Sequence, residues 1–266
     1  MKKLVGGRVQ AFSLVAFSIA FGRFNNNLAA QEQEKVPIKI DYPELSSSHT
    51  HSARQARGEN LDYHSPWEPR PPIFVPVGCD KLLSRGCEVT SSDADPVEGK
   101  LSFITDGVKE HDVSTYVTLM PGLQWIQIDL GSEQEVHAIC IWHFHGGWFA
   151  DPRVLNGRIY RDVIVQVSNN PEFTTGVITV FNNDHDNSAG LGKGKDKEYI
   201  ESRFGRPFAV DAVKGRYVRC YSRGNTSNEM NHYLEVEVFG RRIEREQEAE
   251  TDNAEIRRKK AEEQTQ

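Results

Sequence analysis

Short stretches of alternating apolar and polar residues dominate the middle of this 266-residue chain. In WIQIDLG at 125–131, Ile126 and Ile128 alternate with Gln127 and Asp129, the period of two expected of a strand with one buried face. Similar runs, rich in the Val, Ile and aromatic residues typical of strands, occur at 136–144, 161–168, 177–182, 215–222 and 233–240. Clusters of Gly, Asn, Asp and Pro separate them, and no convincing amphipathic helix of ten residues is found. The pattern predicts an all-β sandwich.

Only residues 75–240 can build a hydrophobic core, and their number suits one domain. Residues 31–74 are rich in Pro, Ser, His and charge and show no apolar period, which predicts a linker or an extended, disordered arm. Residues 241–266 are almost all charged or polar, which predicts a tail that is either a solvated helix or disordered. These polar ends account for the mean hydropathy of −0.57.

The N-terminal residues have the pattern of a secretory signal peptide. Lys2 and Lys3 precede an apolar run, AFSLVAFSIAF at 11–21, and the small residue Ala30 comes before a polar stretch. The run is shorter than the roughly 20 residues that span a bilayer. We therefore predict a signal peptide at 1–30 and a secreted, periplasmic or cell-envelope protein. An uncleaved N-terminal anchor is the alternative.

The charge of the chain argues against nucleic-acid and anionic-lipid partners. The formal net charge is −6, and no stripe of Lys and Arg follows a predicted strand or loop. Proteins that bind phosphate backbones or anionic lipid surfaces need such a positive field.

Four cysteines in an exported chain fit disulfide bonding, and four can pair in three ways. Cys79 and Cys87 lie close together in a glycine-containing stretch, which favours a local disulfide between them. Cys140 and Cys220 lie inside strand-like runs and could form a second bridge or remain two separate buried thiols.

A set of short motifs carries a family resemblance. They occur in this order: ITDG (104–107), WIQIDLG (125–131), VHAICIW (136–142), RYVR (216–219) and LEVEVFG (234–240). The set resembles the discoidin, or coagulation factor 5/8 type C, family of galactose-binding-like jelly rolls over about 80–240, and 160–240 is similar to a bacterial exported branch. The resemblance implies a jelly-roll β-sandwich that binds sugars, or phospholipid head groups in some animal members.

The resemblance also implies a structural calcium ion. Its side-chain ligands would be Asp106 of the ITDG turn and Glu235 of the last strand. Backbone carbonyls of Phe103, Val108 and Leu234 would complete the set, since calcium takes six to eight oxygens. The sequence departs from the family after Gly107, and Asp106 could instead cap its own turn.

A sugar site needs an aromatic ring for the apolar face of the ligand and planar polar groups for its hydroxyls. Two loop segments supply such residues. The predicted ligand-binding residues are Trp148, Phe149, Arg153, Asn225 and Asn228, with Arg158 and Asn231 nearby in sequence. The same residues could equally serve packing and turns.

Two further patterns suggest metal ions. The start of an EF-hand loop is resembled by the alternating residues Asp184, Asp186 and Ser188. Lys195 stands where such a loop needs a Glu to complete the calcium site, which favours a simple loop without an ion. His143 and His145 could chelate zinc or copper, but the sequence names no third ligand.

Catalytic motifs are missing: the sequence has no G-x-S-x-G, no H-E-x-x-H and no phosphate-binding glycine loop. We therefore expect a non-catalytic, carbohydrate-binding protein whose partners are cell-surface or extracellular glycans. An adhesive or structural envelope protein, or a glycan-active enzyme of another type, are the alternatives.

Overall fold

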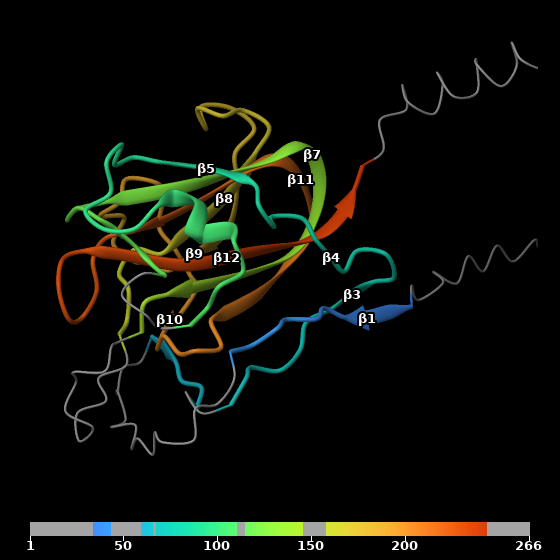
Figure 1. Cartoon of the computed structure of the whole chain (residues 1–266), viewed down its shortest axis with the longest axis horizontal. Coiled ribbons are helices and arrows are strands. Elements are labelled where there is room, and N and C mark those ends of the chain that lie inside the picture. The colour runs from blue at the N-terminus through green and yellow to red at the C-terminus, as the bar shows by residue number, and fades with distance from the viewer. Residues whose placement is uncertain (1–33, 44–59, 66–67, 111–114, 146–157, 244–266) are drawn as a thin grey trace, which may run out of the picture. The chain divides into compact units, whose positions relative to one another are not determined.

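The computed structural model describes residues 34–43, 60–65, 68–110, 115–145 and 158–243, which are coloured in Figure 1. The strands in chain order are β1 (Lys35–Pro37), β2 (Leu61–Asp62), β3 (Phe74–Pro76), β4 (Lys81–Leu82), β5 (Glu88–Ser91), β6 (Val117–Leu119), β7 (Gln124–His143), β8 (Ile164–Ser168), β9 (Ile178–Asn182), β10 (Glu198–Tyr199), β11 (Arg206–Ser222) and β12 (Asn231–Arg242). A single 3-10 turn, η1 (Leu101–Thr105), interrupts them. Within these ranges no helix has the length and apolar character needed to cross a bilayer. The predicted all-β sandwich is confirmed.

Strands β7 and β11 are long enough to run through both layers of the sandwich. The first half of β7 pairs with the second half of β11, whereas the second half of β7 pairs with β12 and with the first half of β11. Register shifts between Ala209 and Val213, and again between Gly215 and Tyr217, mark where the strands bend. One layer therefore contains β5, β8 and β9 beside the long strands, and the other contains β12 with β4 and β6.

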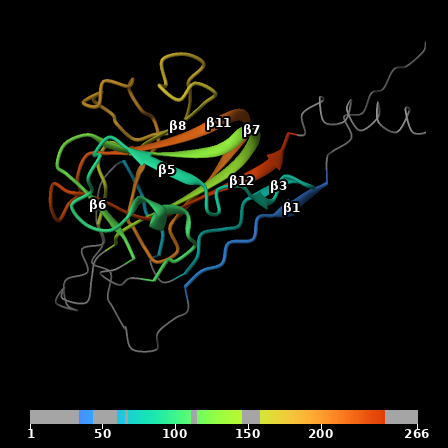
Figure 2. The same cartoon turned by 45° about the horizontal axis from the view of Figure 1, so that its top comes forward.

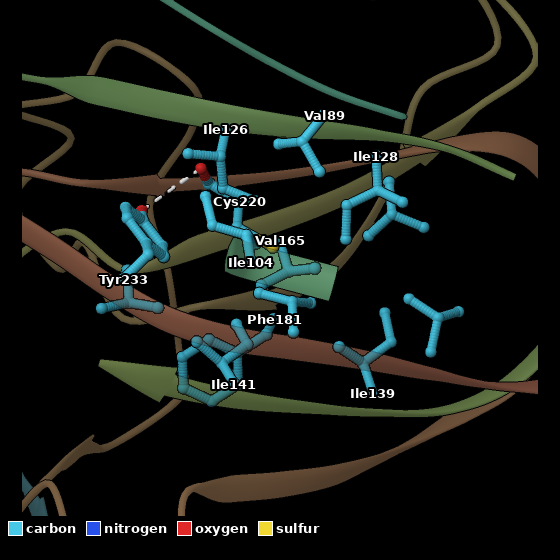
Figure 3. Packing of buried hydrophobic residues seen from close by; sticks show 14 of the residues in the cluster. Val89, Ile104, Ile126, Ile128, Ile139, Ile141, Val165, Phe181, Cys220 and Tyr233 are labelled. Carbon is cyan, nitrogen blue, oxygen red and sulfur yellow. Dashed lines mark hydrogen bonds between the residues drawn. The ribbon is translucent and has the colours of Figure 1, made fainter. Parts of the chain in front are cut away.

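The main core lies between the two layers. Ile126, Ile128 and Val165 of one layer face Ile139 and Ile141 of the other (Figure 3), and all five side chains are fully buried. Successive side chains of a strand point to opposite faces, so the residues at every second position share one face. Burying a side chain of this size contributes about 1.5–3 kcal/mol relative to leaving it exposed.

The outer face of the second layer is also covered, by the described part of residues 31–74. β1 pairs with β3, and a smaller cluster of Ile38, Val75, Ala138 and Phe239 packs there. Figures 1 and 2 both show β1 and β3 near the end of β12. This part of the chain pairs in strands and buries apolar side chains such as Ile38, so the described core is not confined to the predicted 75–240.

A parallel pairing of β2 with β10 holds residues 60–65 to the rest of the chain. Asp62 supports this pairing with two ion pairs, to Arg70 at 2.8 Å and to Arg206 at 3.0 Å. These contacts bring residues from before β3 to the segment that precedes β11.

Candidate functional site

One end of the sandwich gathers polar and aromatic side chains from separate parts of the chain. β7 ends there at His143, and the amide of Phe144 donates to the carbonyl of His232 at the start of β12 (3.3 Å). The backbone of Tyr160 bridges to Asn225 in the turn before β12. We call the following group the loop-end cluster: His143, Phe144, Arg158, Tyr160, Glu201 and His232.

A buried imidazole–carboxylate pair organises the loop-end cluster. His143 Nδ1 lies 2.6 Å from Glu201 Oε1, and both side chains are completely buried. The His143 ring stacks on the ring of Tyr160 with centroids 4.3 Å apart. The amide of Glu201 donates to the carbonyl of Arg158 (2.8 Å), so the pair also fixes the backbone on which Arg158 stands. His143 and Glu201 are therefore positioning residues.

Arg158 presents a polar group next to an aromatic ring. Its guanidinium carbon lies 4.7 Å from the centroid of the Phe144 ring, a cation–π contact. Its Nη1 is buried and has no hydrogen-bond partner among the described residues. A buried N–H group without an acceptor costs about 1–3 kcal/mol. This atom is therefore suited to donate to an oxygen of a ligand.

His232 adds a neutral imidazole. Burial, followed by the positive charge of Arg158 and the effect of His143, lowers the pKa of His232 to about 4. Its Nδ1 lies 3.0 Å from Thr118 Oγ1, and its Nε2 lies 3.3 Å from Asn228 Oδ1. At neutral pH the ring therefore carries one donor and one acceptor nitrogen.

The two predicted asparagines have different roles in the turn before β12. Asn225 is buried, its Nδ2 donates to Asn228 Oδ1 and to the carbonyl of Met230, and its Oδ1 accepts from the amide of Ser227. The side chain of Asn225 is thus used to hold the turn. Asn228 is exposed, and its Oδ1 contacts Asn225 and His232, so its Nδ2 is the atom that a ligand can reach.

The other three predicted ligand residues, Trp148, Phe149 and Arg153, lie outside the described residues. The segment that contains them, 146–157, is bounded by His145 and Arg158. Its two attachment points are therefore at or next to the loop-end cluster. Sequence reasoning did not select Glu201, Tyr160 or His232, because their roles depend on contacts between distant segments.

The predicted calcium residues meet at Gly107. The amide of Gly107 donates to Glu235 Oε2 (2.9 Å), and the amide of Val108 donates to Asp106 Oδ1 (2.8 Å). The second bond is the turn-capping alternative considered for Asp106. Of the residues whose carbonyls were predicted to take part, Phe103 packs against the main core, Val108 is exposed and Leu234 is buried.

Two cations of the chain itself occupy this region. Arg85 donates to the carbonyl of Asp106, and its guanidinium fills the space over Gly107 that a Cβ atom would need. Lys109 Nζ lies 2.6 Å from Glu237 Oε1 and 4.7 Å from the centroid of the Trp142 ring.

Both cations pair with Glu237, Arg85 at 3.8 Å and Lys109 at 2.6 Å, whereas Glu235 Oε1 is buried with no hydrogen-bond partner among the described residues. Calcium at this turn remains a prediction from the resemblance alone.

All four cysteines are free thiols, so the predicted Cys79–Cys87 disulfide is wrong. Cys79 packs in the cluster on the outer face of the second layer, whereas the Cys87 thiol donates to the carbonyl of Leu83 (3.3 Å) and packs against the main core. Cys140 and Cys220 are buried in different clusters, which agrees with two separate thiols.

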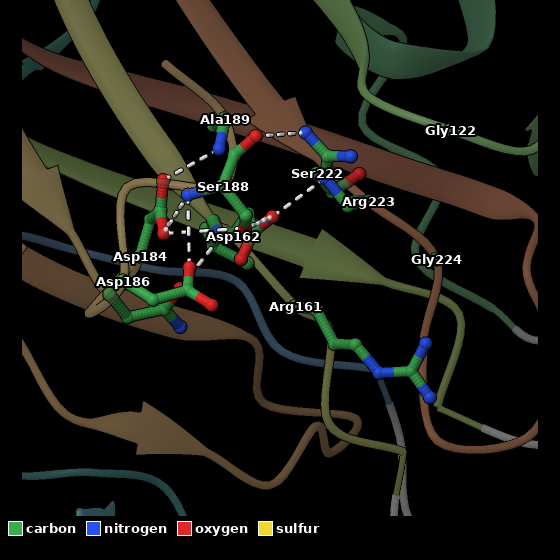
Figure 4. A network of polar contacts seen from close by, with 12 residues as sticks. Gly122, Arg161, Asp162, Asp184, Asp186, Ser188, Ala189, Ser222, Arg223 and Gly224 are labelled. Carbon is green, nitrogen blue, oxygen red and sulfur yellow. Dashed lines mark hydrogen bonds and ion pairs between the residues drawn. The ribbon is translucent and has the colours of Figure 1, made fainter. Parts of the chain in front are cut away.

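The loop at 184–196 is held by its own hydrogen bonds (Figure 4). Asp184 is fully buried and accepts from the amides of Ser188 (3.0 Å) and Ala189 (2.9 Å). Asp162 accepts from Ser188 Oγ and pairs with Arg223 Nε, each at 2.8 Å. The carboxylates are used to fix the backbone, which agrees with the loop interpretation over an EF-hand site.

An open pocket of about 290 Å³ lies beside this loop, between β9 and residues 191–196. Its lining includes Lys193 and Lys195, whereas neither Asn225 nor Asn228 contributes to it. The pocket therefore belongs to a different surface from the predicted sugar residues that the structure describes.

No protein-family model matches the sequence, and no curated protein does. Among solved structures, the CBM32 of AlyQ in complex with 4,5-unsaturated mannuronic acid is 20% identical, with 57% of this chain and 93% of that chain covered and a TM-score of 0.41. Chitosan-binding module 1 from a Paenibacillus sp. IK-5 chitosanase/glucanase is 20% identical, with coverages of 60% and 99% and a TM-score of 0.41. CpGH89CBM32-5 from Clostridium perfringens, in complex with GalNAc-beta-1,3-galactose, is 15% identical, with coverages of 60% and 99% and a TM-score of 0.42. Similarities this distant identify neither a family nor a ligand for this chain.

Proposed function

We propose that this chain is a non-catalytic carbohydrate-binding module whose ligand site is the loop-end cluster. The observation that carries the proposal is the Nη1 of Arg158, which is buried beside the ring of Phe144 and has no hydrogen-bond partner within the described ranges. A guanidinium donates to sugar hydroxyls, and an aromatic ring packs against the apolar face of a sugar.

Neighbouring groups extend this chemistry. His232 is neutral at physiological pH, and its two ring nitrogens contact Thr118 and Asn228, so it helps to hold the site in place. Asn228 is exposed next to it, and its Nδ2 can donate to a hydroxyl group of a ligand. The segment with Trp148, Phe149 and Arg153 begins and ends at this cluster in sequence, which would bring further contacts of the same kind.

Binding without catalysis is favoured by the burial of the ionisable pair. His143 and Glu201 are completely enclosed, so neither can touch a substrate as a general acid or base. A glycan-active enzyme would need accessible carboxylates on both sides of the scissile bond.

We propose in addition that the chain is exported and meets extracellular or cell-surface glycans. The support is the N-terminal pattern of a short positive region, an apolar run and small residues.

A glycan array followed by calorimetry on the hits tests the ligand proposal. We expect weak binding, with dissociation constants of about millimolar to high micromolar, or roughly −4 to −6 kcal/mol. Arg158→Ala should weaken it about 10- to 150-fold, since a hydrogen bond to a charged group contributes about 1.5–3 kcal/mol.

Arg161→Ala is the matched control, because the Arg161 side chain is 46% exposed and pairs with Glu229. Equal binding by Arg158→Ala and the parent would exclude the loop-end cluster. Absence of binding to any glycan would favour the adhesive or structural role.

A further inference from the structure

Three potential metal ligands, one from the turn after β3 and two from β7, meet although their positions are far apart in the sequence. The Cys79 thiol, a carboxylate oxygen of Glu135 and a ring nitrogen of His137 all lie within 4.8 Å of one another. No other group of three such side chains is this close in the part of the chain that the structure describes. None of the three residues belongs to the loop-end cluster or to the turn at Gly107.

The backbone holds each of these residues in place. Cys79 ends a tight turn in which its amide donates to the carbonyl of Pro76 (2.9 Å), and Gly78 supplies the positive φ of +85° that the turn needs. His137 lies at a register shift in the pairing of β7 with β12, and such irregularities redirect side chains. Cys79 and His137 are both buried.

Hydrogen bonds orient the carboxylate between them. Glu135 Oε1 lies 2.7 Å from His137 Nε2, and Glu135 Oε2 accepts from Arg241 Nη2 at 2.7 Å. A metal ion could replace the contact between Oε1 and the imidazole while Arg241 continues to hold Oε2. Outer partners of this kind fix the direction of a metal ligand.

We propose that Cys79, Glu135 and His137 bind a zinc-type divalent cation. Zinc takes thiolate sulfur, imidazole nitrogen and carboxylate oxygen in a tetrahedron with bonds of about 2.0–2.3 Å. Such bonds place the ligand atoms roughly 3.3–3.8 Å apart, so small side-chain rotations from the present arrangement suffice. A water molecule would take the fourth position.

The donor set selects this class of metal. Sulfur and nitrogen ligands suit zinc and its neighbours, whereas calcium and magnesium require oxygen. A thiolate and a carboxylate balance the two positive charges of the ion. Binding converts the Cys79 thiol to its thiolate and releases that proton to solvent. The ion would tie the turn after β3 to β7.

Cobalt titration of the reduced, EDTA-treated full chain tests the proposal. A thiolate bound to Co²⁺ gives a near-ultraviolet charge-transfer band, and we expect this band to saturate at one ion per chain and to disappear when Zn²⁺ is added. Cys79→Ser should abolish the band, and His137→Gln should weaken Co²⁺ binding at least about tenfold. Arg241→Ala should weaken it about 10- to 100-fold, the usual effect of removing an outer partner.

Cys87→Ser is the matched control, because Cys87 is a free thiol that is not part of the group, and it should keep the band. Circular dichroism in EDTA checks that each variant is folded. If Cys79→Ser does not fold, the result for His137→Gln decides the test. A wild-type protein without the band, or a band that survives in Cys79→Ser, would overturn the proposal. Loss of the band in Cys87→Ser would do the same.

Discussion

Replacing Glu235 by glutamine tests the charge state of the carboxyl group at the Gly107 turn. Glu235 is 1% exposed; its Oε2 accepts from the amide of Gly107, and its Oε1 has no hydrogen-bond partner among the described residues. Burial, with a contribution from the negative charge of Glu237, raises the pKa of Glu235 from 4.5 to about 8. At pH 7 the folded protein therefore keeps a proton that the unfolded chain loses.

The size of the effect follows from the difference between these pKa values. Each pH unit between the unfolded pKa and the working pH costs the folded state 1.36 kcal/mol. The loss of folding stability caused by keeping Glu235 protonated is thus near zero below pH 4.5, about 1 kcal/mol at pH 5 and about 3 kcal/mol at pH 7. It reaches about 5 kcal/mol once the pH passes the folded pKa near 8.

Glutamine is neutral at every pH and can still accept from Gly107. Glu235→Gln should therefore raise the free energy of unfolding by up to about 3 kcal/mol at pH 7 and by about 1 kcal/mol at pH 5. At about 2–4 °C for each kcal/mol, the melting temperature should rise by about 6–12 °C at pH 7. Thermal and urea melts at pH 5, 7 and 8 measure this, with Glu229→Gln as the control because the Glu229 side chain is 68% exposed.

Calcium provides the refuting outcome. If the ion bound here, Glu235 would be ionised and stabilised by it. Glu235→Gln would then lower the melting temperature at pH 7, and added calcium would stabilise the parent but not the variant. That pair of results would refute the neutral carboxyl group and support the calcium site that the resemblance implies.

Three other predictions concern the pair at Glu237, the loop-end cluster and the thiols. Lys109→Met should lower the free energy of unfolding by about 3 kcal/mol at pH 7, because buried Glu237 loses its nearest partner and keeps only the longer ion pair with Arg85 at 3.8 Å. Adding Glu237→Gln should restore most of the stability in urea melts, and no restoration would contradict the pairing. Glycan affinity should be constant between pH 5 and 8 and fall only near pH 4, where His232 gains its proton, so a calorimetric transition at pH 6–7 would contradict the neutral imidazole. Intact-mass analysis of secreted protein, alkylated in denaturant without reductant, should show a chain that starts near Gln31 and carries four alkylated thiols. Fewer than four alkylated thiols would indicate a disulfide.

The strand content could be predicted where burial follows a simple period. Ile126 and Ile128 alternate with polar residues, and both face the main core as expected. The sequence did not predict that the runs at 125–131 and 136–144 form one strand, because the residues between them resemble a turn. β11 likewise begins at Arg206, well before the predicted run at 215–222, and a register shift between Ala209 and Val213 interrupts the pairing of its first half with β7.

Only the parts of the candidate site that lie in one short stretch of sequence could be predicted. The sequence shows an aromatic and polar stretch after the run at 136–144, but the pairing of His143 with Glu201 joins segments that no short-range pattern connects. The disulfide prediction was wrong for a related reason. Closeness in sequence does not set the directions of two Cβ atoms, and disulfide geometry depends on those directions.

The continuity of β7 and β11 through both layers has a consequence for how the protein folds. Neither layer has a complete set of strands of its own, because each borrows half of the same two strands. Formation of the sandwich requires Ile128 to find Val218, a partner far along the chain, before the two faces can close. Pairing over such separations makes folding slow, and we expect milliseconds to seconds rather than microseconds. The same continuity leaves no hinge between the layers, so the sandwich should unfold as one cooperative unit.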